Sequence, residues 1–248
     1  SDDRTFHVVA SDGGYLPATV AMTALTIAPG ERFEALVNFA DGKSVQLLTA
    51  ADTRGMIGMG MGPAMGSMMQ GVSGGDAGVL MRFDVDSSLP APVKSVPSTL
   101  VALPQPALGS SMSRRQISLD MGPAMMGRGR GGMGRIGMGP PVGINGRVFD
   151  MNRIDFEPKL GSSEIWKVTS SMMAHPFHVH GVIFRVLSIG GAPPAPHLAG
   201  GKDTILLDGS AELLMQFTQP ATRSTPFMFH CHILEHEDAG MMGQFATS

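Results

Sequence analysis

Six of the eight histidines and the single cysteine fall in two short segments of the sequence, residues 175–181 and 230–242. The first reads His-Pro-Phe-His-Val-His-Gly, and the second begins His-Cys-His. On a β-strand, residues two apart share a face and neighbours point to opposite faces. His178 and His180 would therefore share one face, as would His230 and His232, while Cys231 points the other way. This alternation predicts two metal centres back to back.

The ligand types on each face point to copper. Cys231, with His175 and His236 brought in by turns and Met241 ten residues later, supplies a thiolate, two imidazoles and a weak thioether. That set is typical of a blue copper electron-transfer site, whereas structural zinc usually takes four strong ligands. The other face is all imidazole, which also suits copper. It comprises His178, His180, His230 and His232. The peptide units flanking Cys231 would join the two centres by a short covalent path.

Two structural or catalytic alternatives compete with this interpretation. A single buried His or Cys is more often a packing residue than a ligand, and Met241 alone would be assigned to a core. A Cys-His protease is the other alternative, but no orienting Asn or Asp is marked and the flanking imidazoles would have no role there. The phasing of six histidines with one cysteine favours metal binding over both.

The rest of the sequence is typical of an all-β protein. Short strand-like segments separated by Gly, Pro and Asp turns are expected at residues 5–10, 24–27, 32–39 and 45–48, and again at 147–149, 164–170, 177–189, 204–207, 212–217 and 226–231. A short helix is possible after His232. We expect two Greek-key β-sandwiches, a truncated one over residues 1–86 and a complete one over 117–248.

Segments of biased composition separate and interrupt these domains. Residues 54–70 and 121–138 are rich in methionine and glycine and are expected to form loops. Residues 87–116 carry five prolines and several serines, which predicts an extended linker.

Composition excludes several other classes of function. The formal charge of −3 provides no basic field for nucleic acid. No apolar run approaches the roughly 20 residues of a membrane helix, and the first residues do not resemble a signal peptide, so we expect a soluble, already trimmed chain. One cysteine cannot form an internal disulfide, so Cys231 must be a packing residue, a nucleophile or a ligand.

The two histidine segments resemble the C-terminal copper signatures of multicopper oxidases. Further segments resemble the bacterial copper efflux oxidases: ASDGG at 10–14, PGERFE at 29–34, ING at 144–146, FDMN at 149–152 and LEHED at 234–238. The resemblance implies cupredoxin-like domains and a periplasmic location. Carried over by position, it implies a type 1 copper held by His175, Cys231, His236 and Met241, a type 2 copper held by His178, and a type 3 pair held by His180, His230 and His232. Cys231, His230, His232 and Glu237 are the expected catalytic residues.

The chain departs from the family in one respect. The trinuclear cluster of the family takes four further imidazoles from two His-x-His pairs in an N-terminal domain, and only His7 precedes residue 175 here. We read His7 and His197 as structural residues. The chain would therefore be the C-terminal half of an oxidase, with the N-terminal half as its partner, on a separate chain or a cleaved fragment. Together they would couple oxidation of a reducing substrate to reduction of O2 to water.

The methionines suggest cuprous ion as a substrate, because thioethers are soft ligands. Phenols are expected to be oxidised less selectively. Met173 and Glu237 lie where the family places cuprous ligands, although Ser171 stands where a carboxylate is expected. Core packing for Met173, a solvated acid for Glu237 and low-complexity sequence for the methionine tracts are the alternatives. Two other functions compete: a copper carrier or one-electron relay using only the blue site, and a relative that kept the fold and lost the metal, as division-associated members have.

Overall fold

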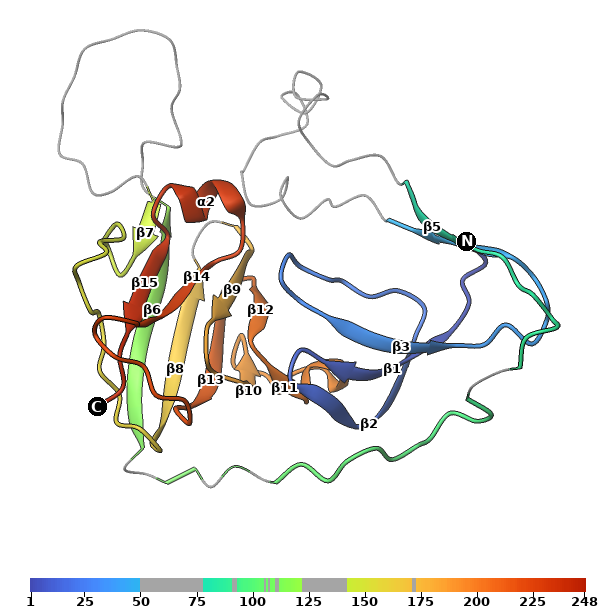
Figure 1. Ribbon diagram of the computed structural model, residues 1–248, viewed down its shortest axis with the longest axis horizontal. Coiled ribbons are helices and arrows are strands. Elements are labelled where there is room, and N and C mark those ends of the chain that lie inside the picture. Colours follow the sequence, from blue (N-terminus) through green and yellow to red (C-terminus); the bar gives the residue numbers. More distant parts are fainter. Residues whose placement is uncertain are drawn as a thin grey trace, which may run out of the picture.

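The computed structural model describes residues 1–49, 78–90, 93–104, 106, 108–109, 112–121, 142–170 and 173–248. Regular structure in these residues is almost entirely β, which confirms the predicted class (Figure 1). The methionine-rich segment 54–70 and all but the first residue of 121–138 lie outside the described residues.

The C-terminal half is a sandwich of two sheets. Neighbouring strands are antiparallel except β6 and β8, which run parallel. The larger sheet has the order β11 (Gly201–Lys202), β10 (Phe184–Ile189), β13 (Ser210–Gln216), β8 (Ser163–Ser170), β6 (Ser113–Met121), β7 (Val142–Ile144). The smaller has the order β12 (Thr204–Leu207), β9 (His175–Val179), β14 (Phe227–Cys231), β15 (Met242–Phe245).

An aromatic cluster fills the space between these two sheets. Trp166 on β8 is fully buried. Its ring centroid lies about 6 Å from the ring centroids of four phenylalanines, Phe156, Phe217, Phe229 and Phe245. The indole N–H donates to Glu164, which also receives two hydrogen bonds from Arg115. The indole N–H of Trp166 and the Glu164 carboxylate, at the edge of this aromatic cluster, therefore both have hydrogen-bond partners.

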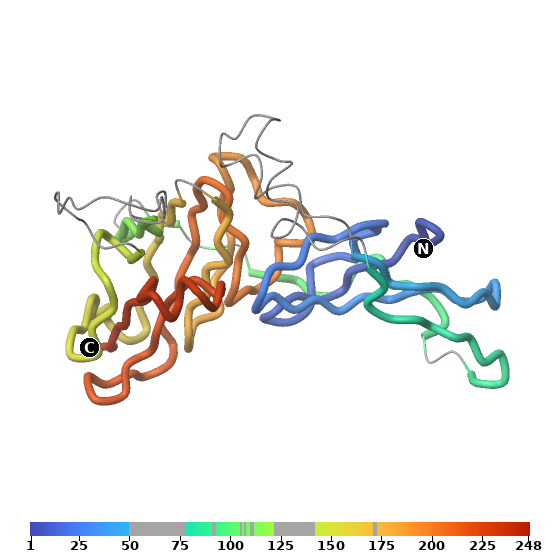
Figure 2. The backbone as a smooth tube through the Cα atoms, turned by 90° about the horizontal axis from the view of Figure 1, so that it is seen from above, coloured from blue at the N-terminus to red at the C-terminus, as the bar shows by residue number. Residues whose placement is uncertain are grey.

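The N-terminal half contains two small antiparallel sheets. One is β2 (Gly14–Met22), β1 (Phe6–Ser11), β3 (Phe33–Val37), and the other is β4 (Val45–Leu48) with β5 (Val79–Phe83). The turn between β1 and β2 lies against β11, because the Gly13 N–H and the Ser11 hydroxyl both donate to the Gly201 carbonyl. Figures 1 and 2 both show β1 and β2 beside β11 and β12.

Helical structure in the described residues is limited to two short elements. These are the 3-10 helix η2 (Pro196–Leu198) and the helix α2 (Leu234–Asp238), which confirms the short helix expected after His232. No helix among the described residues is long and apolar enough to cross a membrane.

One strand prediction for the N-terminal part of the chain was wrong, and one strand begins inside the predicted linker. Residues 24–27 form no strand; the strand lies instead at β2, which contains Pro17. Pro17 is tolerated because β2 is an edge strand and needs no ladder donor there. Strand β6 begins at Ser113, inside the segment predicted as linker.

Two strand predictions for the C-terminal half also need correction. Residues 177–189 are two strands, β9 and β10, rather than one. Gly181 lies between them with φ of 67°, a conformation that ends a strand. Residues 147–149 form no strand, and Arg147 makes only an isolated bridge to Ile144.

Replacing Trp166 by alanine tests the position of the core. The change should lower the free energy of unfolding by about 3–5 kcal/mol, because it removes a fully buried ring and leaves a cavity. Urea denaturation of the metal-free chain measures this, with Met151→Ala as the control because Met151 is 81% exposed. Equal unfolding curves for the two variants would contradict this core.

Candidate metal centres

The register between β9 and β14 positions both groups of candidate ligands. His178 lies directly opposite His230, and Cys231 lies opposite Phe177. Phe177 and Cys231 are fully buried in the core between the sheets. His178 and His230 lie on the other face, where their ring centroids are 5.4 Å apart. The alternation along β14 therefore sends a thiol and an imidazole to opposite sides of one strand.

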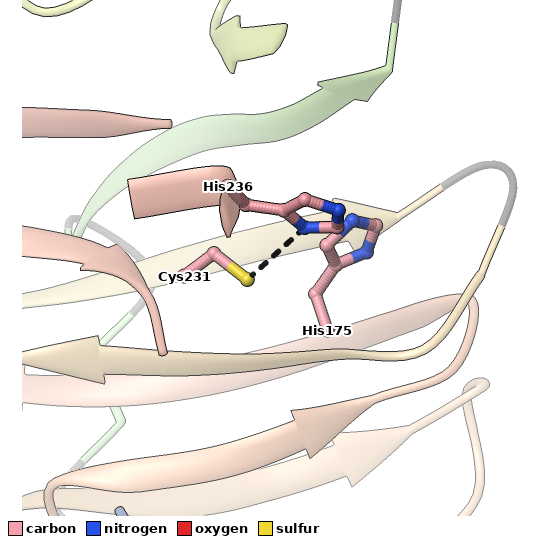
Figure 3. A group of neighbouring side chains, drawn as sticks. All are labelled: His175, Cys231 and His236. Carbon is pink, nitrogen blue, oxygen red and sulfur yellow. Dashed lines mark hydrogen bonds between the residues drawn. The ribbon is translucent and has the colours of Figure 1, made fainter. Parts of the chain in front are cut away.

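The first group is made by His175, Cys231 and His236, all of them buried (Figure 3). His175 begins β9, Cys231 ends β14 and His236 lies on α2, and their potential ligand atoms are all within 4.8 Å of one another. The Cys231 Sγ is 3.6 Å from the His236 Nδ1. A thiol and two imidazoles thus converge on one point in the interior.

Burial keeps this group uncharged in the metal-free chain. Burial, with a smaller contribution from the charge of Glu237, raises the pKa of Cys231 to about 12, although the hydrogen bond from the Ile233 N–H acts in the opposite direction. Burial and the neighbouring His236 lower the pKa of His175 to about 4. The pKa of His236 is lowered by burial as well. A neutral thiol and two neutral imidazoles result, and a metal ion would displace the thiol proton.

The hydrogen bonds of His175 leave one ring nitrogen unused. The Ser170 hydroxyl donates to the Met173 carbonyl, so it accepts from the His175 Nδ1 at 2.8 Å. The His175 Nε2 is buried and has no hydrogen-bond partner. A buried imidazole lone pair and a thiol in the same group fit the donor preferences of copper, so these residues could hold such an ion.

The backbone of Met241 is hydrogen-bonded to residues of this group. Its side chain is fully buried. Its N–H donates to the His236 carbonyl, and its own carbonyl accepts from the Cys231 N–H. The structure therefore brings Met241 alongside two of the three residues of the first group.

The second group is on the opposite face of β14. Potential ligand atoms of His178, His180 and His230 lie within 4.8 Å of one another. The Nε2 atoms of His180 and His230 face each other at 3.1 Å, close enough to share one proton or one metal ion. The ring of His232, just beyond the end of β14, is centred 5.5 Å from that of His230 and 5.8 Å from that of His178.

Backbone carbonyls fix which nitrogen of two of these rings carries the proton. A carbonyl oxygen can only accept, so the Nδ1 of His178 donates to Asp203 and the Nδ1 of His230 donates to Cys231. Each Nε2 is left with a lone pair directed into the group. Burial and neighbouring His178 and His230 lower the pKa of His180 to about 4, and burial also lowers that of His230. These rings are thus ready to act as neutral ligands.

Four other residues singled out from the sequence belong to neither group. Glu237 is half-buried, with its carboxylate 3.4 Å from the His230 Nδ1, and Met173 is half-buried before β9. His7 lies on β1, and His197 on η2 packs against Phe33.

Sequence reasoning missed the residues that support the ligands. Ser170 holds His175, while Asp203 and Thr204 hold His178. Asp203 is 25 residues from His178 in sequence and belongs to no recognisable motif, so only the pairing of β12 with β9 reveals the contact.

The raised pKa of Cys231 predicts slow alkylation of the folded chain. At pH 8 the buried thiol should react with iodoacetamide more than about 100-fold more slowly than in urea, because only the thiolate is nucleophilic. Mass spectrometry follows the single cysteine directly, and a thiol peptide in the same tube controls for the reagent. Equal rates in the folded and unfolded chain would contradict the burial of the sulfur.

Comparison with known proteins places this site in a family. Residues 118–248 match the family described as Multicopper oxidase. A laccase-like multicopper oxidase, CueO, from an Ochrobactrum species is 41% identical, with a TM-score of 0.81, over 100% of this chain and 51% of its own. A metallo-oxidase from Campylobacter jejuni is 26% identical, with a TM-score of 0.74, over 99% of this chain and 49% of its own.

Curated relatives carry a different name. The cell division protein FtsP of Escherichia coli is 33% identical over 100% of this chain and 47% of its own length, and that of a Rahnella strain is 34% identical over 98% and 46%. The chain spans about half the length of these relatives. Their match and that of residues 118–248 lead to one conclusion: the chain belongs to the multicopper oxidases, as a C-terminal half built of cupredoxin-like β-sandwiches.

Proposed function

We propose that this chain is the substrate-oxidising half of a multicopper oxidase that couples one-electron oxidation of cuprous ion and phenols to four-electron reduction of O2 to water. The observation that carries the proposal is the pair of ligand groups on opposite sides of β14. Membership of the family supports copper as the metal of both groups.

Each ligand group would have a distinct role. Copper, when bound, supplies the one-electron redox chemistry. His175, Cys231, His236 and Met241 would hold the type 1 ion, His178 the type 2 ion, and His180, His230 and His232 the type 3 pair. Cys231 is covalently joined to both His230 and His232, so the backbone itself connects the two sites. The buried, preorganised ligands exclude water and limit rearrangement at the thiolate site.

The second group needs further ligands from a partner. A cavity of about 930 Å³ opens beside His178 and His180 and is also lined by Tyr15, Val101 and Phe227. The N-terminal half of the same oxidase, on a separate chain or a cleaved fragment, would supply the remaining imidazoles at this face. The length of the relatives supports this, because this chain covers only 46–51% of the chains of the relatives named above.

Cuprous ion is the preferred substrate in this proposal, and phenols would be oxidised less selectively. The chain has 21 methionines, and thioethers bind the soft cuprous ion. Met173 and Glu237 flank His175 and His236 in sequence, so a cuprous ion held by them would be near the electron entry point. A periplasmic location fits this chemistry.

A second candidate is a role in cell division, either without metal or as a one-electron relay. The name of the FtsP relatives favours it. The first ligand group argues against a metal-free protein, because the buried His175 Nε2 has no hydrogen-bond partner and such a group costs stability.

Copper loading distinguishes these candidates at the first ligand group. The copper-loaded chain should show an intense blue absorption from thiolate-to-copper charge transfer, and Cys231→Ser should abolish it, because an alcohol is not a soft anionic donor. His197→Gln is the control, since His197 lies outside both groups. A blue Cys231→Ser variant would refute the ligand assignment, and a colourless wild-type chain would favour the metal-free candidate.

Oxygen consumption tests whether the chain is half of an oxidase. With an added redox dye as the electron acceptor, the copper-loaded chain alone should oxidise cuprous ion or a phenol with little uptake of O2, and addition of the N-terminal half of the oxidase should restore uptake at one O2 per four electrons. An oxygen electrode with a matched dye-reduction assay measures both. Uptake that stays absent with the partner present would instead support the relay.

A further inference from the structure

A cluster of charged side chains, most of them buried, joins the two halves of the chain beside His178. Three of its members come from the first 32 residues of this chain, one from β11 and one from the position between β11 and β12: Asp12, Glu31, Arg32, Lys202 and Asp203. Lys202 and Asp12 have fully buried side chains, and that of Glu31 is 3% exposed. Such groups are costly to bury and stay charged only when paired.

Lys202 anchors one side of the cluster. Its ammonium lies 3.0 Å from the Asp12 carboxylate and 3.2 Å from that of Glu31, and it packs over the ring of Phe33. Asp12 also accepts hydrogen bonds from the backbone N–H groups of Asp203 and Thr204, each at 3.3 Å. The first 32 residues of this chain thus hold the side chain of Lys202 and the backbone of residues 203–204 directly.

Arg32 anchors the other side. Its guanidinium donates two hydrogen bonds to the Asp203 carboxylate, at 2.6 and 2.8 Å, and its backbone N–H donates to Asp12 at 2.7 Å. A bidentate pair of this kind fixes orientation as well as distance. The position of Asp203 is therefore set by residues that lie 171 or more positions earlier in the sequence.

This fixed segment is what contacts His178. The His178 Nδ1 lies 2.9 Å from the Asp203 carbonyl and 2.9 Å from the Thr204 hydroxyl, and that hydroxyl donates to the Asp203 carboxylate. Both oxygens therefore accept from the same Nδ1–H. Neither could do so if residues 203–204 shifted by much more than an ångström.

We propose that Arg32 and Asp203 are positioning residues that orient the His178 ring, with its Nε2 free, for metal binding on the imidazole face of β14. This inference rests on the proposed function, because it concerns the same ligand group. The N-terminal part of this same chain then acts on the site as well as supporting the fold. Partners behind a metal-binding imidazole fix its tautomer and direction, and their loss weakens metal affinity by about 10–100-fold.

The charge of the cluster also suits a cation at this site. Three carboxylates face two cationic side chains, so one negative charge remains close to the His178 ring. A second contact from the same half reaches the neighbouring ligand, since a side chain at Gly30 would lie 2.6 Å from the His232 ring. The loop carrying Arg32 therefore packs against the ring of His232 and reaches His178 through residues 203–204.

Arg32→Ala tests the proposal in the full chain. Arg32 is 54% exposed, so the variant should fold, and Arg114→Ala is a matched control because Arg114 is 61% exposed and pairs with Glu212 away from the site. Long-range proton–nitrogen NMR of the metal-free chain reads the tautomer of His178, assigned with His178→Gln. Titration with cupric ion measures the affinity of the non-blue copper, while blue absorbance reports the thiolate site.

Arg32→Ala should give a mixed His178 tautomer and non-blue copper affinity lower by about tenfold or more, with the blue band unchanged. In both measurements Arg32→Lys should lie between the wild type and Arg32→Ala, and Arg114→Ala should match the wild type. Wild-type behaviour of Arg32→Ala in both measurements would overturn the proposal. If Arg32→Ala also weakened the blue band and lowered the melting temperature, the proposal would be overturned as well, because Arg32 would then only support the fold. A wild-type chain without blue colour would refute the proposed function, and the NMR result would still decide the positioning.

Discussion

The pairing of β9 with β14 is the constraint on which the rest of the site depends. It sets His178 opposite His230 and Cys231 opposite Phe177, so imidazoles gather on one face while the sulfur enters the core. A slip of one residue in this register would exchange the faces and destroy both groups. The aromatic core around Trp166 fixes the register by packing Phe229 of β14 between the sheets.

Burial then gives the two groups their chemical character. A sulfur and imidazoles excluded from water are uncharged without a metal, as the raised pKa of Cys231 and the lowered pKa of His175 indicate. The interior therefore holds soft and borderline donors in place before any ion arrives. The charged residues lie behind the imidazole face, where Arg32 and Asp203 support His178 from outside the core.

The sequence was sufficient to predict the all-β class and the residues that meet at each group, because alternation along a strand needs only local geometry. Residues 24–27 and 14–22 show where local patterns fail: Pro17 disfavours a strand unless that strand is known to lie at an edge. Asp12 and Arg32 lie in segments that resemble the copper efflux oxidases, but their contacts with Asp203 could not be foreseen, because they join residues separated by more than 170 positions. The assignment of individual ions to these ligands stays a prediction.

Anomalous diffraction at the copper edge, from crystals of the copper-loaded chain, tests the central claim most directly. We expect a copper peak within bonding distance of the sulfur and of the rings of His175 and His236, and separate copper density on the far side of β14 against His178, His180 and His230. A sulfur packed only against hydrocarbon, with no peak beside it, would contradict it.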